Sequence, residues 1–98
     1  MRVTIESVLV QDKEPVGADL DGGSVLLSVR AGAYFSLNQV ASEIWQMLVE
    51  PRRVEQIFAA LIENHDVDAQ TVARDVTPFL QTLVEQRLLR VIESSKVP

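Results

Sequence analysis

The stretch GAYFSLNQVASEIW, residues 32–45, contains two local patterns with no loop between them. Residues 33–37 carry the aromatic and apolar side chains typical of a strand. Beyond Asn38 the apolar residues recur at helical spacing. Asparagine favours a helix N-terminus because its side chain accepts a hydrogen bond from an unpaired amide of the first turn. The stretch therefore predicts a strand that leads directly into a helix, whose apolar stripe consists of Val40, Ala41, Ile44, Trp45 and Leu48.

Two more strands are predicted upstream of this stretch. They are residues 3–10, VTIESVLV, which are rich in β-branched side chains, and residues 24–29, SVLLSV. The intervening residues 11–23 contain Pro and Gly and indicate a connection with a tight turn. Because the connections are short, the strands predict an antiparallel meander with residues 33–37 at its edge. The apolar residues that share one face of the second strand are Val25, Leu27 and Val29.

Three helices are predicted after these strands. The first begins at Asn38 and ends just before Pro51, which disfavours a helical conformation in the preceding residue. The second covers about residues 54–64, and the third covers about residues 69–86 with Asp68 as its cap. The predicted inward side chains are Ile57, Phe58, Leu61 and Ile62 in the second helix, and Val72, Val76, Phe79, Leu80, Leu83 and Val84 in the third.

The predicted elements fit into one domain, residues 1–98. Its sheet covers about residues 3–37 and its helices about residues 38–87, followed by a short terminal strand at 88–92 and a frayed tail at 93–98. The order of elements favours an α+β fold of the winged helix-turn-helix type, with a three-stranded antiparallel sheet followed by three helices.

The composition indicates a folded, acidic protein of the cytoplasm. Of the 98 residues 47% are hydrophobic, and 14 Asp and Glu against 9 Lys and Arg give a net charge of −5. A negative field repels nucleic acid and anionic membranes, so we expect neither as a partner. The sequence has no cysteine, no secretory signal after Met1, and no window near the roughly 20 apolar residues of a membrane span.

No catalytic, metal or cofactor site is predicted from the titratable residues. His65 lies in a polar segment beside Asp66, which is typical of a solvated loop histidine. The acidic pairs Asp19/Asp21 and Asp66/Asp68 lack the further oxygen ligands of a calcium loop, and turn or capping roles explain them. No serine has a nucleophile motif, and no Gly-rich phosphate loop occurs. We therefore expect a protein that binds and does not catalyse.

The order of elements leaves a DNA-binding regulator of the winged-helix type as an alternative. Such a protein needs basic and amide side chains toward the DNA groove and basic flanks for the phosphates. The third helix and its end offer Arg74 and Arg87, but Asp75 and Glu85 lie among them. The only local basic cluster, residues 52–53, is also explained as a solvated turn. The net negative charge disfavours this alternative.

The predicted edge strand, residues 33–37, indicates peptide recognition instead. An edge strand exposes unpaired amides and carbonyls, and this one lacks the Lys or Pro that protects many edges. An extended peptide could pair with it and insert alternate side chains into pockets. Two other uses stay open: Phe35 and Leu37 cover the core while Tyr34 covers the sheet, and the edge pairs with a second copy of the chain.

Three motifs together resemble the PqqD-like family, the peptide-recognition elements of pathways that make ribosomally synthesised, post-translationally modified peptides (RiPP recognition elements). They are GAYFSLN-x-x-ASEIW-x-x-L at 32–48, IFAAL at 57–61 and DVTPFLQTL at 75–83. The resemblance covers about residues 20–92, and the step from Leu-Asn into a helix with Ile-Trp is its most specific part. Within the family the chain most resembles the stand-alone leader-peptide-binding subunit of lasso peptide biosynthesis.

The resemblance implies noncatalytic binding of a precursor's leader peptide, antiparallel to the third strand and in a groove between that strand and the third helix. It implies delivery of the precursor to a leader protease and a cyclase, and no cofactor. The alternative within the family is the PqqD-type chaperone of a quinone-cofactor precursor peptide. The implied peptide-binding residues are Ala33, Tyr34, Phe35 and Ser36 for main-chain pairing, Val72, Val76 and Phe79 for the apolar groove, and Asp75 for a basic group of the leader.

Two positions depart from the family pattern. Family members often have Gly and Ser or Thr after the first helix, where this chain has EPRR at residues 50–53. They also often have Gly before the final Leu-Leu, where Arg87 stands here. Both departures concern the ends of helices.

Overall fold

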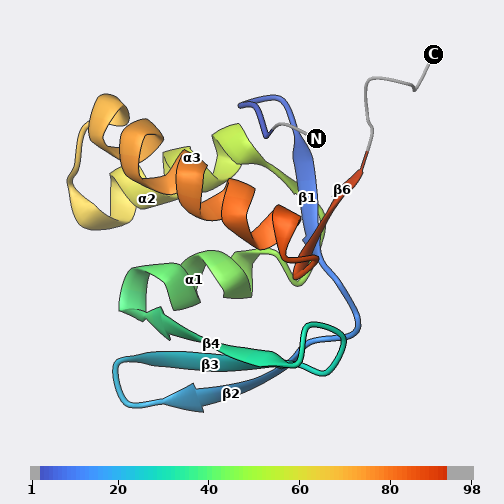
Figure 1. Cartoon of the computed structure of the whole chain (residues 1–98). Helices are drawn as coiled ribbons and strands as arrows, with labels where there is room; N and C mark the ends of the chain where they lie inside the picture. The colour runs from blue at the N-terminus through green and yellow to red at the C-terminus, as the bar shows by residue number, and fades with distance from the viewer. Residues whose placement is uncertain (1–2, 93–98) are drawn as a thin grey trace.

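The structure is a computed structural model that describes residues 3–92, apart from the side chain of Leu20. It shows an α+β fold in which three helices lie above one small sheet and beside another (Figure 1). The predicted tail, residues 93–98, lies outside the described residues. In chain order the elements are β1 (Val8–Gln11), β2 (Val16–Leu20), β3 (Gly23–Ser28), β4 (Ala33–Asn38), α1 (Gln39–Met47), β5 (Arg52–Arg53), α2 (Val54–His65), α3 (Ala69–Glu85) and β6 (Leu89–Ile92).

The strands of the described residues form two antiparallel sheets of three strands each. Their strand orders are β2-β3-β4 and β5-β1-β6. In the first sheet Leu27 of β3 pairs with Val16 of β2 on one side and Tyr34 of β4 on the other. In the second sheet Leu9 of β1 pairs with Arg52 and Val91. The second sheet therefore joins the two ends of the described chain to the segment between α1 and α2.

A three-stranded antiparallel sheet precedes the helices as predicted, but one of its strands was predicted wrongly. Residues 16–20, predicted as part of a connection, form β2, whereas only residues 8–10 of the predicted first strand (3–10) are in a strand, and that strand, β1, belongs to the other sheet. The physical reason is the tight turn at Asp21–Gly22, which places residues 16–20 directly beside β3. Gly22 has a φ of 79° in this turn, a conformation that glycine adopts without steric cost. The prediction that residues 33–37 form an edge strand is confirmed by β4.

Strand β3 buries the opposite face from the one its apolar residues suggest. Ser24, Leu26 and Ser28 are buried, while Val25 is half-buried and Leu27 is exposed. Val25 and Leu27 do share a face, as predicted, but that face points away from the core. The helix α1 packs on the other face, over β3 and β4.

The predicted caps of α1 and α3 are confirmed. The Asn38 carboxamide oxygen accepts a hydrogen bond from the amide of Ala41 at 2.8 Å, and the Asp68 carboxylate accepts one from the amide of Thr71 at 2.7 Å. The edge strand β4 is thus joined directly to α1 through the single capping residue Asn38.

The segment after α1 differs from the prediction because β1 pairs with it. The helix ends at Met47, before the predicted end near Pro51, and the Leu48 carbonyl accepts a hydrogen bond from the Gln11 amide at 2.8 Å. Arg52 and Arg53, predicted as a solvated turn, form the exposed two-residue strand β5 against β1. The predicted terminal strand is present as β6, on the other side of β1.

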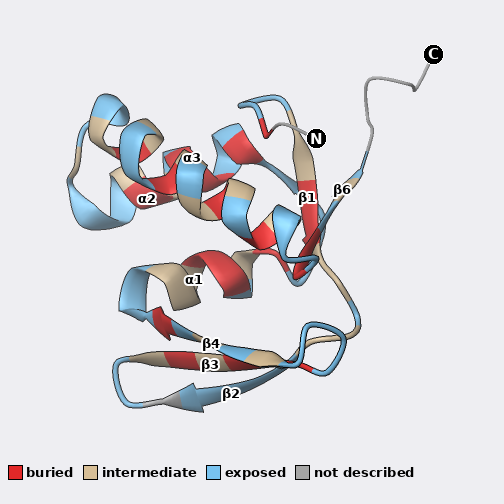
Figure 2. Cartoon of the chain, in the orientation of Figure 1, coloured by how far each residue is buried: buried red, intermediate tan, exposed pale blue. Residues whose placement is uncertain are grey.

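The core lies between two layers (Figure 2). One layer consists of the sheet β2-β3-β4 together with α1, and the other consists of α2, α3 and the second sheet. Most predicted inward residues are buried, but Val40 of the predicted stripe in α1 is 40% exposed. That exposure leaves an apolar side chain at a surface hollow. The buried residues of the three helices and the turn after α1 are Ile44, Trp45, Leu48, Val54, Ile57, Phe58, Leu61, Val72, Val76, Leu80 and Leu83.

Candidate functional site

A mostly apolar hollow of about 260 Å³ opens where the C-terminal end of β4 meets α1 and the middle of α3. Asn38 places the end of the edge strand in its wall, and α3 contributes the opposite wall. Its apolar lining matches the pockets that accept side chains of bound peptides. The residues that line this first hollow are Asn38, Val40, Ala41, Ile44, Asp75, Val76 and Phe79.

A second, smaller hollow of about 140 Å³ continues the first toward the turn between α2 and α3. The two hollows share Val40, Asp75 and Val76, so together they form one groove between α1 and α3, called here the α1–α3 groove. The groove starts at the end of β4 and runs along the N-terminal half of α3. The second hollow is lined by Val40, Leu61, His65, Val67, Thr71, Val72, Asp75 and Val76.

The structure brings together the four predicted site residues of α3. Phe79 lines the first hollow, Val72 the second, and Asp75 and Val76 line both. Val72 and Val76 are buried, whereas Phe79 is partly buried and Asp75 is exposed. Phe79 and Asp75 are therefore the side chains of this set most open to a ligand.

The groove was predicted between the edge strand and the third helix, but it lies between α1 and α3, and the predicted pairing residues of β4 lie beside it and line neither hollow. Of Ala33, Tyr34, Phe35 and Ser36, the first and third are half-buried and the other two are exposed. Their strand is free along the side that faces away from β3. The edge and the groove are contiguous through Asn38, which belongs to both.

His65 is exposed, as predicted, but it belongs to a helix and not to a loop. His65 is the last residue of α2, and its Nε2 lies 2.8 Å from the Glu43 carboxylate of α1. The contact with Glu43 joins α2 to α1, and the His65 ring lines the second hollow at the wall of the groove. Twenty-two positions separate the partners, and no local sequence pattern reports a contact over that spacing.

The charges at the groove are exposed. The Arg74 Nε donates to the Asp75 carboxylate at 3.1 Å, and this hydrogen bond raises the pKa of Arg74. The amide of Thr71 donates to Asp68 and lowers the pKa of that carboxyl group. Because Asp75 and Arg74 are both well exposed, their mutual attraction is weak and a ligand cation could compete for the carboxylate.

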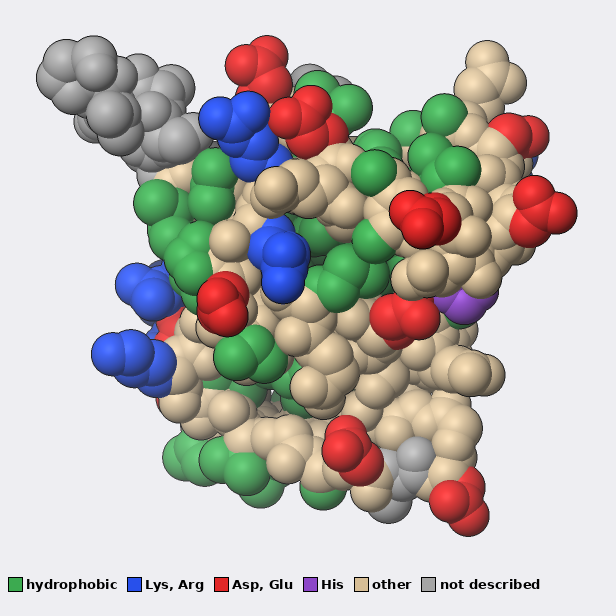
Figure 3. All heavy atoms as spheres, turned by 180° about the vertical axis from the view of Figure 1, so that it is seen from behind, with side chains coloured by type: hydrophobic (Ala, Val, Ile, Leu, Met, Phe, Trp, Pro, Cys, Tyr) green, Lys and Arg blue, Asp and Glu red, His purple; other side chains and the backbone are tan. Residues whose placement is uncertain are grey.

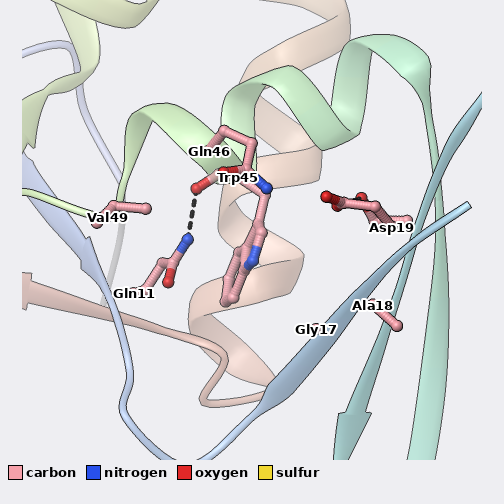
Figure 4. A pocket seen from close by; sticks show the side chains of 8 residues that line it. Gln11, Gly17, Ala18, Asp19, Trp45, Gln46 and Val49 are labelled. Carbon is pink, nitrogen blue, oxygen red and sulfur yellow. Dashed lines mark hydrogen bonds between the residues drawn. The ribbon is translucent and has the colours of Figure 1, made fainter.

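A separate cleft of about 240 Å³ lies at the opposite edge of the sheet, between β2 and the end of α1 (Figure 4). Its wall is mainly polar, with the Asp19 carboxylate and the Trp45 indole facing it, and the Gln11 side chain donates to the Trp45 carbonyl at 2.7 Å. None of the predicted site residues lines it. Its polar wall lacks the apolar surface that a peptide anchor needs.

Neither a metal centre nor a membrane span is found in the described part of the chain. No three His, Cys, Asp or Glu side chains of residues 3–92 converge as metal ligands. No helix among these residues has both the length and the apolar character needed to cross a bilayer.

Residues 23–89, more than half of the chain, match the family of coenzyme PQQ synthesis protein D (PqqD). The chain is a member of the PqqD family. The matched segment starts at β3 and ends at β6, so it contains β4, the α1–α3 groove and all predicted site residues.

Two solved structures resemble this PqqD-family chain over most of its length. One is TbiB1 in complex with the TbiA(beta) leader peptide, with 38% identity, a TM-score of 0.75, and coverage of 83% of this chain and 94% of that chain. The other is a lasso peptide synthetase B1 complexed with the leader peptide, with 27% identity, a TM-score of 0.72, and coverage of 84% and 96%. No curated protein matches the sequence.

Proposed function

We propose that this protein is a noncatalytic adaptor that binds the leader segment of a ribosomally synthesised precursor peptide in lasso peptide biosynthesis. The leader adds a strand to the free edge of β4, antiparallel to it, and places apolar side chains in the α1–α3 groove. Ala33 to Ser36 supply main-chain pairing, Val72, Val76 and Phe79 supply apolar contacts, and Asp75 meets a basic group. Both similar solved structures are complexes with leader peptides, which supports the proposal.

The observation that carries the proposal is the contiguity of a free strand edge with an apolar groove. A peptide paired with β4 reaches Asn38 at one end, and the first hollow opens there. Main-chain pairing alone would bind any extended peptide, so the groove adds the selection of side chains. One added strand with two or three buried side chains is consistent with affinity between micromolar and nanomolar.

The adaptor holds the precursor near a leader protease and a cyclase of the same pathway in the cytoplasm. Binding the leader raises the effective concentration of the core peptide at those enzymes. The adaptor itself supplies no reacting group, and it needs no cofactor.

The decisive experiment is a titration of a labelled leader peptide, from the precursor encoded beside this chain, followed by fluorescence polarisation. We expect saturable binding that is lost when the leader sequence is scrambled. A second labelled peptide, the leader of a quinone-cofactor precursor, separates the two candidate pathways. Failure to bind either leader, together with binding of duplex DNA at the same salt, would overturn the proposal in favour of a regulator.

A further inference from the structure

A polar cleft of about 280 Å³ lies between the turn that precedes β4 and the C-terminal end of α3. It is called here the arginine cleft, because two guanidinium groups belong to its wall. Figure 3 shows most of the visible Lys and Arg side chains in the left half of the molecule, the half in which Figure 1, seen from behind, places this turn and the end of α3. The residues that line the arginine cleft are Arg30, Ala31, Glu85, Gln86 and Arg87.

Both guanidinium groups of the arginine cleft are exposed and have hydrogen-bond donors to spare. Among residues 3–92 the Arg87 side chain has no hydrogen bond or ion pair. The Arg30 Nη2 lies 3.8 Å from the Asp12 carboxylate, which is longer than a hydrogen bond. The Glu85 carboxylate, the acidic group of the wall, accepts a hydrogen bond from Gln81 at 3.4 Å. Both arginines can therefore donate to a further carboxylate, whose geometry the guanidinium fork matches.

The backbone at Arg87 indicates that its side chain has a ligand. Its φ of 63° lies in the left-handed region, which glycine adopts without strain and other residues do not. A cation near the end of a helix also interacts favourably with the helix dipole. That interaction does not require a left-handed residue, because the neighbouring exposed position, Gln86, lies at the same helix end. Strain of this kind persists mainly where a side chain has a function.

The arginine cleft and the first hollow lie at opposite ends of the path proposed for the leader. The six residues of β4 span about 17 Å, and α3 rises about as far from Asp75, in the first hollow, to Gln86, in the arginine cleft. A leader antiparallel to β4 has its N-terminal part at Asn38 and its C-terminal part at Ala33. The core peptide follows the leader, so it leaves the adaptor beside the arginine cleft.

The two ends of this path carry opposite charges. Asp75 lies at the first hollow, whereas Arg30 and Arg87 lie at the other end. Main-chain pairing selects few side chains, and complementary charges fix the register and direction of a partner. An extended chain advances about 3.3 Å per residue, so a side chain at the arginine cleft follows the one in the first hollow by about five to seven residues.

We propose that the arginine cleft binds an acidic side chain of the leader, about five to seven residues C-terminal to the residue that fills the first hollow. This inference rests on the proposed function and assigns the same ligand a contact outside the apolar groove. The contact fixes the direction of the leader and directs the core peptide out of the adaptor over the turn before β4.

The test measures leader affinity by fluorescence polarisation, at low and high salt, for Arg30→Gln, Arg87→Gln and Arg87→Gly. Arg53→Gln is the matched control, because Arg53 is exposed and lines neither the groove nor the arginine cleft. At low salt we expect each Arg30 and Arg87 variant to bind about three- to fivefold more weakly, with a smaller effect at high salt, and the control to bind as the wild type does. Arg87→Gly should bind weakly although it relieves the strained backbone, which separates loss of the cation from loss of stability. Glu85→Gln, which removes the opposing carboxylate, should bind more tightly.

A second leader peptide, in which the acidic residue at the predicted spacing is replaced by its amide, completes the test. We expect this peptide to bind the wild type and Arg87→Gln equally, because the charge that Arg87 contacts is absent. Three results would overturn the inference and leave the proposed function intact: a leader without an acidic residue at that spacing, arginine variants with unchanged affinity, or equal losses with both peptides. A wild type that binds no leader would remove the proposed function itself.

Discussion

At the scale of single residues, Arg87 occupies a backbone position that suits glycine. Its φ is 63°, in the left-handed region, immediately after the C-cap of α3. The amide of Arg87 donates to the Val84 carbonyl at 3.0 Å, and the amide of Leu88 donates to the Leu83 carbonyl at 2.9 Å. This is the Schellman arrangement that ends many helices, usually with Gly at the left-handed position. The departure from the family pattern at this position therefore places a side chain where the backbone favours glycine, and the fold tolerates the resulting strain.

We predict that Arg87→Gly stabilises the fold by about 0.5–1 kcal/mol, because glycine adopts the left-handed conformation without the penalty of a Cβ atom. The measurement is the free energy of unfolding in urea. Ala59→Gly, at an exposed position inside α2, is the control and should destabilise by about 1 kcal/mol. Equal losses from both changes would contradict the strain at Arg87.

Phe79 and Leu80 are neighbours in α3, but only Phe79 lines the α1–α3 groove. Phe79 is partly buried and lines the first hollow, whereas Leu80 is fully buried in the core. We predict that Phe79→Ala lowers leader affinity by about tenfold or more while the protein stays folded. Leu80→Ala should instead cost about 2–5 kcal/mol of stability. Polarisation titrations and urea unfolding of both variants separate these effects, and a Phe79→Ala protein that unfolds would assign Phe79 to the core.

At the scale of elements, Glu14 ties the connection between β1 and β2 to the turn between β3 and β4. Its carboxylate accepts hydrogen bonds from the Ser28 hydroxyl at 2.8 Å, the Val29 amide at 2.6 Å and the Arg30 amide at 3.2 Å. These donors, the Ser28 hydroxyl foremost, lower the pKa of Glu14 below its ordinary value of 4.5. The turn that leads into β4 is therefore positioned by a carboxylate from outside its own hairpin.

The lowered pKa of Glu14 predicts an acid-sensitive contribution to stability. A carboxyl group whose pKa is lower in the folded state stabilises it above the unfolded pKa, here about 4.5, and loses this effect as the pH falls through the folded pKa. Glu14→Gln should therefore be less stable than the wild type at pH 7, with a difference that shrinks below about pH 4.5. Urea unfolding from pH 3 to 7 measures it, with exposed Glu50→Gln as control. A difference that stays constant over this range would contradict the assignment.

At the scale of the whole molecule, the second sheet connects segments that are far apart in the sequence. Leu9 of β1 is fully buried, and β1 lies between β5 and β6. This strand lies outside residues 23–89, the segment that matches the PqqD family. In this chain, therefore, a strand outside the family segment fills part of the shared core.

We predict that Leu9→Ala destabilises the protein by about 2–5 kcal/mol, because it opens a cavity in the core. Val16→Ala, on the exposed side of β2, should change stability by less than about 0.5 kcal/mol. Thermal and urea unfolding of the two variants provide the measurement. A small effect of Leu9→Ala would show that the N-terminal strand is dispensable for the core.

The sequence by itself determined the presence of the three helices, the N-terminal caps of α1 and α3, and the edge strand that leads into α1. These features depend on contacts within three or four residues, such as those of Asn38 with Ala41 and Asp68 with Thr71, and local patterns report such contacts well. Four of the residues of α3 that line the groove, Val72, Asp75, Val76 and Phe79, also followed from the family resemblance, whereas Thr71 did not. Only the tertiary structure decided the pairing of β1 with β5 and β6, the contact of His65 with Glu43 and which face of β3 is buried. Each of these depends on which distant segment lies opposite, and strand pairing and burial of one face are set by packing of the whole chain and not by local propensity.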